Sequence, residues 1–343
     1  MRISMREYIS TFPTGFSQLI PRALKRLLPG AQVLQVYDGL VHYRYGGREG
    51  DLGKVFLFHN TFLVIRSFAG PACELDRMIR AAASLKSLPE SCGTFRVRYS
   101  VKNQFVAVSR DKTRQLEGKI AALTHSRVDR VSPATEYWFL QRSEGVGFFC
   151  RLLGKRQATE KNLHPGELRP ELAYLMGLLA GLGQDSVVMD PFAGYGGIPK
   201  QLLRYFPHAL LYVSDLDPDR AQDLQKSFGQ QKGVRAARRD ALKLEDIPAA
   251  TVDAIVTDPP WGYYEEMGDI PAFYRQMFQA FRRVLKERGR LVLLSARKQE
   301  AEAAAAEQGF LLEQRYDTLV NGKKAAVYVF RPTPPKSYPQ ERL

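Results

Sequence analysis

No run of 18 uninterrupted apolar residues occurs in this 343-residue chain, so its sequence predicts no membrane-spanning helix. The first 16 residues also lack the continuous apolar segment of a secretory signal. Cysteine is scarce: Cys73, Cys92 and Cys150 are odd in number and widely spaced, which favours free thiols in a reducing compartment. We therefore expect a soluble, cytoplasmic protein.

Metal-ligand spacing is absent as well. The five histidines form no HxH or HExxH pattern, and the cysteines form no CxxC pattern, so no metal site is predicted. What is present is an ordinary globular balance, with 45% hydrophobic and 25% charged residues. The length suits two or three domains.

Positive charge is concentrated in the first part of the chain. The net charge is +14, and residues 1–150 hold 22 basic against 12 acidic residues, which leaves only +4 for residues 151–343. A basic region beside a nearly balanced one favours a polyanion-binding module attached to a catalytic domain. A moderately basic protein without nucleic-acid binding remains the alternative on charge alone.

The first 155 residues have the pattern of an α+β fold. Strands are expected at 31–37, 40–45, 54–59 and 61–68, and a helix at 71–88. In 94–101, Phe95, Val97 and Tyr99 alternate with Arg96, Arg98 and Ser100, as in a strand with one arginine-bearing face. A charged helix (110–123) and strands at 135–142 and 146–153 follow.

From about residue 166 strands and helices alternate. The expected strands are 186–190, 209–215, 234–240, 254–258 and 290–296, with a long helix at 272–289 and two terminal strands. This order predicts a doubly wound parallel sheet covered on both faces, and such sheets bind ligands at the carboxyl ends of their strands.

Asp190 opens a glycine-rich loop at the first of these strand ends. Gly194, Gly196 and Gly197 allow the backbone to approach a ligand closely. The loop is not a phosphate-binding P-loop, and the dinucleotide fingerprint fails because Pro199 occupies the third glycine position. Alone, such a loop is equally typical of a plain strand-to-helix turn.

Two further acids stand at strand ends. Asp215 lies 21 residues after Gly194, where a carboxylate can accept hydrogen bonds from both hydroxyls of a ribose. Asp217, before Pro218, suits the helix-capping role better. Asp240 could accept a hydrogen bond from an adenine amino group, or it is an ordinary surface acid.

The tetrapeptide Asp258-Pro259-Pro260-Trp261 is the sharpest signal. Two prolines stiffen the turn, so that the Asp258 carboxylate and a neighbouring carbonyl can face one point beside the flat indole. Two acceptors and a stacking plane suit a planar NH2 group. Accepting its hydrogens makes the nitrogen a better nucleophile towards an electrophilic methyl group. A rigid turn with a buried tryptophan is the structural alternative.

These motifs together resemble those of class I S-adenosylmethionine-dependent amino-methyltransferases. They are DPFAGYGG from 190, the acid at 215, RRDA at 238–241 and DPPW from 258. The preceding EKNLHPGELRPELAYLM (160–176) is similar to the leader of the THUMP-domain RNA methyltransferases. Tyr195, at a position often held by a small residue, and Trp261, in place of the commoner tyrosine, depart from the family pattern.

The resemblance implies a fold and a division of the chain. The expected α/β fold is a Rossmann-like, seven-stranded class I methyltransferase domain preceded by an α+β amino-terminal region with a THUMP-like RNA-binding module. The parts are 1–90 (amino-terminal α+β, ferredoxin-like region), 91–155 (THUMP-like module), 156–335 (S-adenosylmethionine-dependent catalytic domain) and 336–343 (tail).

The resemblance also implies that S-adenosyl-L-methionine is the cofactor and that it leaves as S-adenosyl-L-homocysteine. The implied methyl acceptor is the N2 amino group of a guanosine in RNA, most often tRNA. Asp258, Pro259, Pro260 and Trp261 would hold the target base, with Tyr263 or Tyr264 as further stacking candidates. The implied cofactor-binding residues are Leu168, Arg169, Pro170, Asp190, Phe192, Gly194, Gly196, Asp215, Leu216, Asp240 and Ala241.

The basic module is expected to bind RNA phosphates. The candidate residues are Arg96, Arg98, Lys102, Arg110, Lys112 and Arg114, each of which could equally belong to a solvated charged face. Other acceptors stay open: an adenine or cytosine amino group, rRNA or snRNA, or a glutamine amide in a protein. A non-catalytic RNA-binding protein that keeps the fold is the alternative from another class.

Overall fold

The computed structural model describes residues 5–53, 55–89, 93–155, 163–164, 166–263 and 268–334. The chain forms two compact units, one of Met1–Phe12 with Ser17–Gln157 and the other of Pro13–Phe16 with Ala158–Leu343. Cys92, the tail expected at 336–343 and part of the leader at 160–176 lie outside the described residues.

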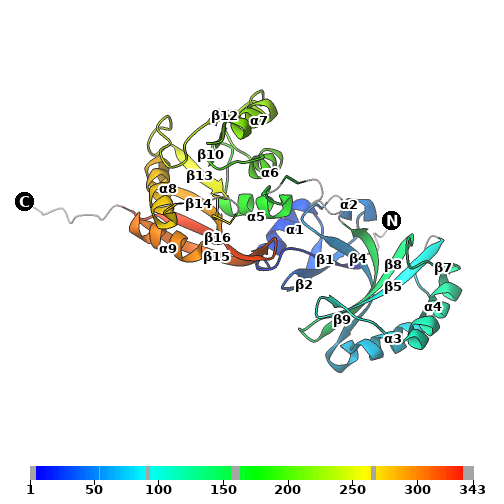
Figure 1. Ribbon diagram of the computed structural model, residues 1–343. Coiled ribbons are helices and arrows are strands. Elements are labelled where there is room, and N and C mark those ends of the chain that lie inside the picture. Colours follow the sequence, from blue (N-terminus) through cyan, green and yellow to red (C-terminus); the bar gives the residue numbers. More distant parts are fainter. Residues whose placement is uncertain are drawn as a thin grey trace, which may run out of the picture. The chain divides into compact units, whose positions relative to one another are not determined.

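The first unit is built on a nine-stranded sheet with the order β2-β3-β1-β4-β9-β8-β5-β6, and β7 pairs with β5 outside this path (Figure 1). Its strands are β1 (Arg6–Thr11), β2 (Gln32–Tyr37), β3 (Leu40–Tyr45), β4 (Asn60–Ala69), β5 (Thr94–Val101), β6 (Gln104–Phe105), β7 (Arg127–Val128), β8 (Thr135–Gln141) and β9 (Val146–Lys155). Its helices are α1 (Ile20–Leu27), α2 (Glu49–Leu52), α3 (Leu75–Ala83) and α4 (Arg110–Thr124), and a 3-10 turn, Gly70–Cys73, precedes α3.

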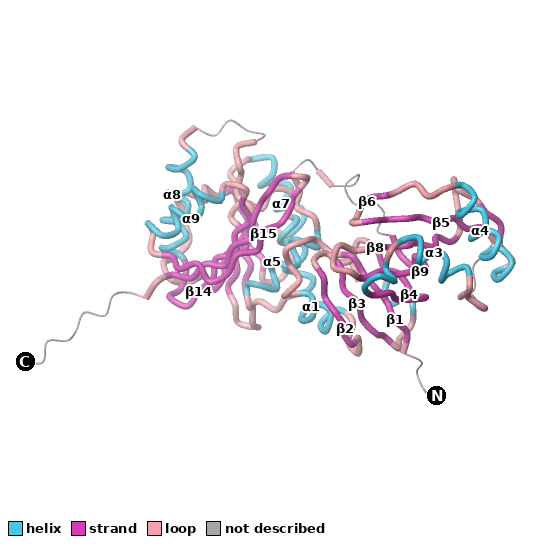
Figure 2. Tube along the Cα trace, turned by 90° about the horizontal axis from the view of Figure 1, so that it is seen from below, coloured by secondary structure: helices cyan, strands magenta, loops and turns pink. Residues whose placement is uncertain are grey.

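Two helices cover one face of this sheet. Met78 and Ile79 of α3 and Leu116 of α4 pack on Phe95 and Tyr99 of β5, and Val97 is packed against the same cluster. Figure 2 shows α3 and α4 next to each other beside β5. Arg96 and Arg98 therefore lie on the opposite face, as the alternation predicts.

The expected boundary at 90/91 falls between α3 and β5. The strands on its two sides belong to one continuous sheet, because β4 pairs with β9. The separation of a 1–90 region from a 91–155 module therefore stays a prediction. Two local expectations differ from the structure. Residues 55–59 form turns rather than a strand, with Val55 and Phe58 buried, and β1, which the sequence did not signal, pairs with both β3 and β4.

The second unit contains the seven-stranded sheet, with the order β12-β11-β10-β13-β14-β16-β15. Its strands are β10 (Val187–Asp190), β11 (Leu210–Asp215), β12 (Val234–Arg238), β13 (Val252–Thr257), β14 (Leu285–Ser295), β15 (Phe310–Val320) and β16 (Lys323–Pro332). Its helices are α5 (Pro170–Ala180), α6 (Gly197–Tyr205), α7 (Pro218–Phe228), α8 (Ile270–Val284) and α9 (Lys298–Glu307).

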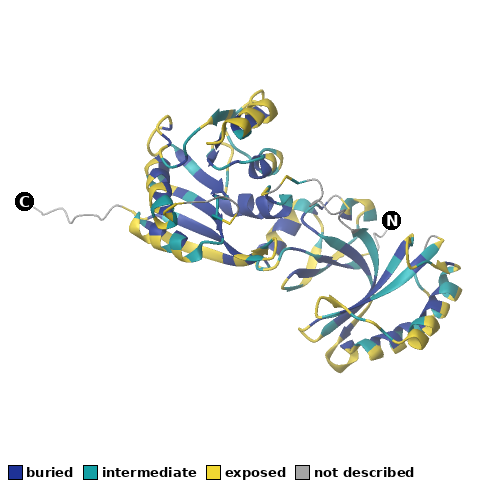
Figure 3. Ribbon diagram, in the orientation of Figure 1, coloured by how far each residue is buried: buried dark blue, intermediate teal, exposed yellow. Residues whose placement is uncertain are grey.

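The strands from β12 to β14 are parallel, while β16 runs antiparallel to both β14 and β15. The predicted parallel, doubly wound arrangement is confirmed, with a carboxyl-terminal hairpin closing one edge. Helices α8 and α9 pack on one face of the sheet, and Figure 1 shows α5, α6 and α7 on the other. Figure 3 shows β10, β13 and β14 buried between these layers.

The helix expected at 272–289 ends at Val284, and β14 begins at the next residue because Leu285 already pairs with Val252. The amino-terminal segment Pro13–Phe16 belongs to this second unit. Phe16 stacks on Tyr316 at a ring-centroid distance of 5.6 Å, and the Thr318 hydroxyl donates to the Thr14 carbonyl at 2.9 Å.

Candidate functional site

Three acids stand at the carboxyl ends of neighbouring strands. Asp190 ends β10, Asp215 ends β11 and Asp258 follows β13. Because β10 pairs in parallel with both β11 and β13, these ends meet at one edge of the sheet. The structure thus brings together the three acids that the sequence singled out.

Asp190 is fully buried in the middle of this edge. Its Oδ1 accepts hydrogen bonds from the Thr257 hydroxyl at 2.8 Å and from the Phe192 amide at 3.3 Å, while its Oδ2 has no partner among the described residues. Burial above all, with a smaller contribution from the charge of nearby Asp215, raises the pKa of Asp190 to about 7, against the lowering effect of the hydrogen bonds from Thr257 and Phe192. An unpartnered buried oxygen is costly without a ligand, which suggests that one completes the site.

The glycine loop presents two contrasting glycines. Gly194 has a φ of +51°, and a Cβ added there would meet nothing within 4 Å. Gly196 has a φ of +80°, but a Cβ there would lie 2.7 Å from the Phe228 ring. Gly196 therefore serves packing against α7, whereas Gly194 borders open space where a ligand could approach the backbone.

Asp215 joins this loop to the second strand end. Its Oδ2 accepts from the Gly194 amide at 2.9 Å and its Oδ1 from the Asp217 amide at 3.0 Å. A carboxylate has about four lone-pair sites, so each oxygen keeps one for a diol. As expected, Asp217 is the helix cap, since its side chain accepts from the amides of Asp219 and Arg220 at the start of α7.

The remaining cofactor candidates surround these acids. Leu216 is exposed and Ala241 is buried. Asp240 Oδ1 accepts from the Leu242 amide at 3.0 Å, which orients its carboxylate. Phe192 packs beside the Phe273 ring at 5.9 Å.

The leader approaches the same loop. The backbone oxygen of buried Leu168 would lie 3.1 Å from a Cβ on Gly197, so this glycine is needed for close approach of the leader. Arg169 and Pro170 begin α5 as its cap and first residue. The unusual Tyr195 stacks on His164 at a centroid distance of 4.2 Å and an interplanar angle of 11°.

The proline corner holds two buried polar groups that face each other. Asp258 Oδ1 and the indole Nε1 of Trp261 are close enough for the indole N–H to lower the pKa of the carboxyl, but neither atom forms a hydrogen bond of good geometry among the described residues, and Pro259 between them is buried. Burial raises the pKa of Asp258 well above its ordinary range. The Asp190 charge adds to this rise, and the adjacent Trp261 indole partly offsets it. Pro260 and Trp261 are half-buried, so this corner is partly accessible to solvent.

Sequence reasoning missed the groups that hold this corner. Arg297 Nε donates to the Trp261 carbonyl at 2.7 Å, and the Arg297 amide donates to the Ser295 hydroxyl at 2.9 Å. That hydroxyl lies 2.7 Å from the hydroxyl of buried Tyr274. Ser295 and Thr257 both end strands of the parallel sheet. Their position at strand ends is the feature of the sequence that could have marked them as site residues.

The expected RNA-binding residues differ in their surroundings. Arg96 and Arg98 both pair with Glu136, at 2.7 Å and 3.3 Å, and Lys112 pairs with Asp76 at 2.8 Å. The other three candidates have exposed side chains: Lys102, Arg110 and Arg114.

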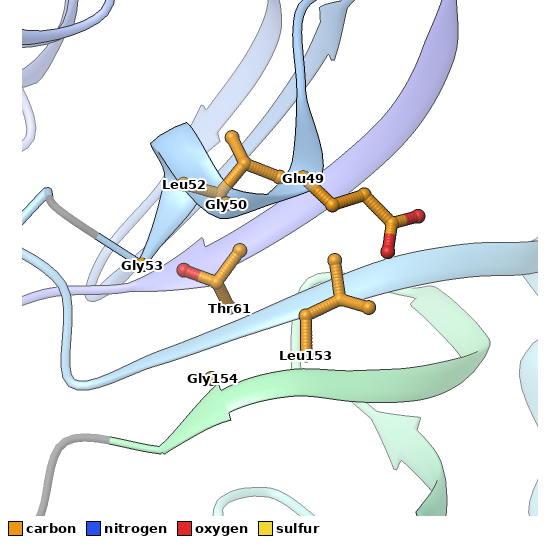
Figure 4. A pocket seen from close by; sticks show the side chains of 7 residues that line it. All are labelled: Glu49, Gly50, Leu52, Gly53, Thr61, Leu153 and Gly154. Carbon is orange, nitrogen blue, oxygen red and sulfur yellow. The ribbon is translucent and has the colours of Figure 1, made fainter. Parts of the chain in front are cut away.

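A cavity of about 240 Å³ also lies in the first unit, lined by Glu49, Gly50, Leu52, Gly53, Thr61, Leu153 and Gly154 (Figure 4). Among the described lining residues the charged group is the Glu49 carboxylate, which is paired with Arg6 at 3.0 Å and Arg151 at 3.3 Å. No cluster of possible metal ligands occurs in the described ranges, and within them no helix is long and apolar enough to cross a membrane.

The sheet order gives the second unit the fold of class I methyltransferases. Residues 206–327 match the family model described as "RMKL-like, methyltransferase domain". TrmN from Thermus thermophilus superposes with a TM-score of 0.77 at 24% identity, covering 96% of this chain and 100% of that one. A possible methylase from Clostridium difficile 630 superposes with a TM-score of 0.70 at 17% identity, covering 97% and 100%. The expected fold is confirmed.

Curated relatives cover a smaller part of the chain. The tRNA (guanine(10)-N2)-dimethyltransferase of Methanocaldococcus jannaschii is 31% identical over 158 residues, which make up 43% of this chain and 43% of that protein. The U6 snRNA (guanine-N(2))-methyltransferase THUMPD2 of Bos taurus is 31% identical over 131 residues, 37% of this chain and 25% of that protein. The chain thus spans a quarter to under half of these relatives. The resemblance to the THUMP-domain methyltransferases is confirmed.

Proposed function

We propose that this protein is an S-adenosyl-L-methionine-dependent RNA methyltransferase that methylates the exocyclic N2 amino group of a guanosine in tRNA. The observation that carries the proposal is the buried Asp258 carboxyl beside the Trp261 indole, at the strand end next to Asp190, where Asp258 Oδ1 and Trp261 Nε1 form no hydrogen bond of good geometry among the described residues. The names of the two curated relatives favour guanine N2 over other amino groups.

The residues present fit the cofactor. Open space at Gly194 admits the amino-acid end, and the unpartnered Asp190 Oδ2 offers an acceptor to its ammonium group. The remaining lone pairs of Asp215 suit the ribose diol, and Asp240 suits the adenine amino group. The related SMU.472 protein was crystallised with S-adenosyl-L-homocysteine, at a TM-score of 0.65 and 14% identity.

The bound cofactor supplies an electrophilic methyl group. Trp261 would stack on an extruded guanine, and Asp258 Oδ1 would accept one hydrogen of its NH2 group. Positive charge develops on that nitrogen during the transfer, and an ionised Asp258 stabilises it and takes the proton. The Arg297 bond to the Trp261 carbonyl keeps the corner in place. Because the pKa of Asp258 is raised, the reaction should accelerate with pH as this carboxyl ionises.

The first unit would bind the RNA phosphates. Its charge excess supports this role, and Lys102, Arg110 and Arg114 are exposed on it. A full-length variant with all three changed to alanine should lose RNA affinity and salt dependence while keeping cofactor affinity. Unchanged RNA binding would remove these residues from the interface. The cytoplasmic location expected from the sequence stays a prediction.

The function is tested by incubating the protein with methyl-labelled S-adenosyl-L-methionine and total RNA, followed by fractionation and mass spectrometry of the nucleosides. Labelled N2-methylguanosine in the tRNA fraction is the expected result. Label in a small nuclear RNA would favour the second candidate substrate, which the U6 snRNA relative suggests. Label on adenosine or cytidine would refute the guanine assignment.

A further inference from the structure

The ring of Tyr263 lies between the proline corner and two cations. It meets the Trp261 indole edge to face at a centroid distance of 6.4 Å and an angle of 83°. Arg297 Cζ lies 4.9 Å from the Tyr263 centroid, and Lys323 Nζ lies 3.6 Å from it. The ring is 46% exposed, so this cluster borders solvent at the edge of the candidate base pocket.

Arg297 is fixed with its charge towards this cluster. Its amide and its Nε are bonded to Ser295 and to the Trp261 carbonyl, which leaves the two terminal guanidinium nitrogens without a partner among the described residues. An anchored guanidinium with free donors is well suited to a bidentate contact with a phosphate.

Lys323 is fixed by a different element. It opens β16, directly after the turn residues Asn321 and Gly322, whose φ values of +50° and +78° are typical of a tight hairpin turn. The same turn receives Arg169 from the leader, whose guanidinium nitrogen lies 3.5 Å from Asn321 Oδ1. The hairpin tip thus meets Arg169 directly, and its Lys323 shares the Tyr263 ring with Arg297.

Both cations lie within cation–π distance of one exposed ring, so two positive charges from different elements meet at Tyr263. An extruded nucleotide brings its own backbone phosphates to the mouth of its pocket. We propose that Arg297 and Lys323, held around Tyr263, bind an RNA backbone phosphate that flanks the target nucleotide.

This inference rests on the proposed function, because the phosphate belongs to the RNA that is methylated. The test compares Lys323→Ala with Lys324→Ala, a neighbouring exposed lysine whose side chain alternates to the other face of the hairpin. Lys323→Arg should restore function. Two quantities are measured at several salt concentrations: tRNA affinity by fluorescence anisotropy in the presence of S-adenosyl-L-homocysteine, and the steady-state rate of methylation.

Lys323→Ala should weaken tRNA binding and raise KM for tRNA by about 5- to 10-fold, while kcat changes less than twofold. The slope of log affinity against log salt should fall by about 0.7, the value for one phosphate contact of a single strand. Lys324→Ala should stay within twofold of wild type. Cofactor affinity, measured by calorimetry, should be the same in all variants.

Equal tRNA affinity of Lys323→Ala and Lys324→Ala would overturn the inference while leaving the proposed function standing. Loss of cofactor affinity instead of RNA affinity would also overturn it, because the anion would then be the cofactor carboxylate. If the wild type transfers no methyl group but Lys323→Ala still weakens tRNA binding with the reduced salt slope, the phosphate site stands and the proposed function fails.

Discussion

Two glycines of one loop allow the cofactor site to be separated from the fold. Gly194 and Gly196 both have positive φ, so alanine at either position costs about 1–2 kcal/mol in backbone strain. At Gly194 the added methyl group meets no described atom within 4 Å apart from its chain neighbours, whereas at Gly196 it lies 2.7 Å from the Phe228 ring.

Gly194→Ala should therefore lower the stability of the protein by the strain alone. This corresponds to a fall in Tm of about 2–8 °C for a unit of this size. Gly196→Ala should lose about 1–3 kcal/mol more, because Phe228 is buried and has to shift. Differential scanning fluorimetry without ligand measures both changes.

Cofactor affinity should follow the opposite order. If the methionine end of the cofactor lies against the Gly194 backbone, the methyl group of Gly194→Ala occupies its place, and Kd should rise at least tenfold, or about 1.4 kcal/mol. Titration calorimetry with S-adenosyl-L-homocysteine measures this value. Gly194→Ala binding as tightly as wild type would refute the assignment of this open space to the cofactor.

Three other changes test the strand-end acids. Asp258→Asn should lower kcat by about 10²- to 10³-fold while tRNA affinity stays within twofold of wild type. The variant should also lose the rise in rate with pH, because that rise comes from ionisation of Asp258. Undiminished turnover would show that Asp258 is not catalytic. Asp215→Asn should weaken cofactor binding by at least tenfold. Asp217→Ala removes only the cap of α7, so it should cost about 1 kcal/mol of stability and leave cofactor binding unchanged. Equal cofactor affinities of the two variants in calorimetry would contradict the ribose assignment. The pKa of Asp190 is raised by folding to about 7, so the contribution of Asp190 to the free energy of unfolding should fall by a few kcal/mol as pH rises from about 4 to 7. Asp190→Asn should lack that part of the fall in thermal unfolding scans, and parallel pH profiles of the two proteins would show that Asp190 is not the group responsible.

The sequence predicted the parts of the site that follow from sheet topology. Asp190, Asp215 and Asp258 each end an apolar strand, and a doubly wound sheet brings such ends to one edge. The alternation in β5 likewise assigned Arg96 and Arg98 to one face, because side chains in a strand alternate irrespective of their partners.

The parts that depend on distant partners could not be read from the sequence. Glu136 pairs with Arg96 and Arg98 from 38 or more residues away, and nothing local marks this ion pair. The strand β1 is selected by pairing with β3 and β4 rather than by its own composition. The bond from Arg297 to Trp261 joins residues 36 positions apart on two strand ends.

The central claim is that the methyl donor and the target NH2 group meet at the Asp258 corner. A crystal structure of the protein soaked with S-adenosyl-L-homocysteine tests it most directly. The account predicts the ribose on Asp215 and the sulfur next to the space between Asp258 and Trp261. Electron density for the ligand elsewhere, or a sulfur separated from that space by protein atoms, would contradict it.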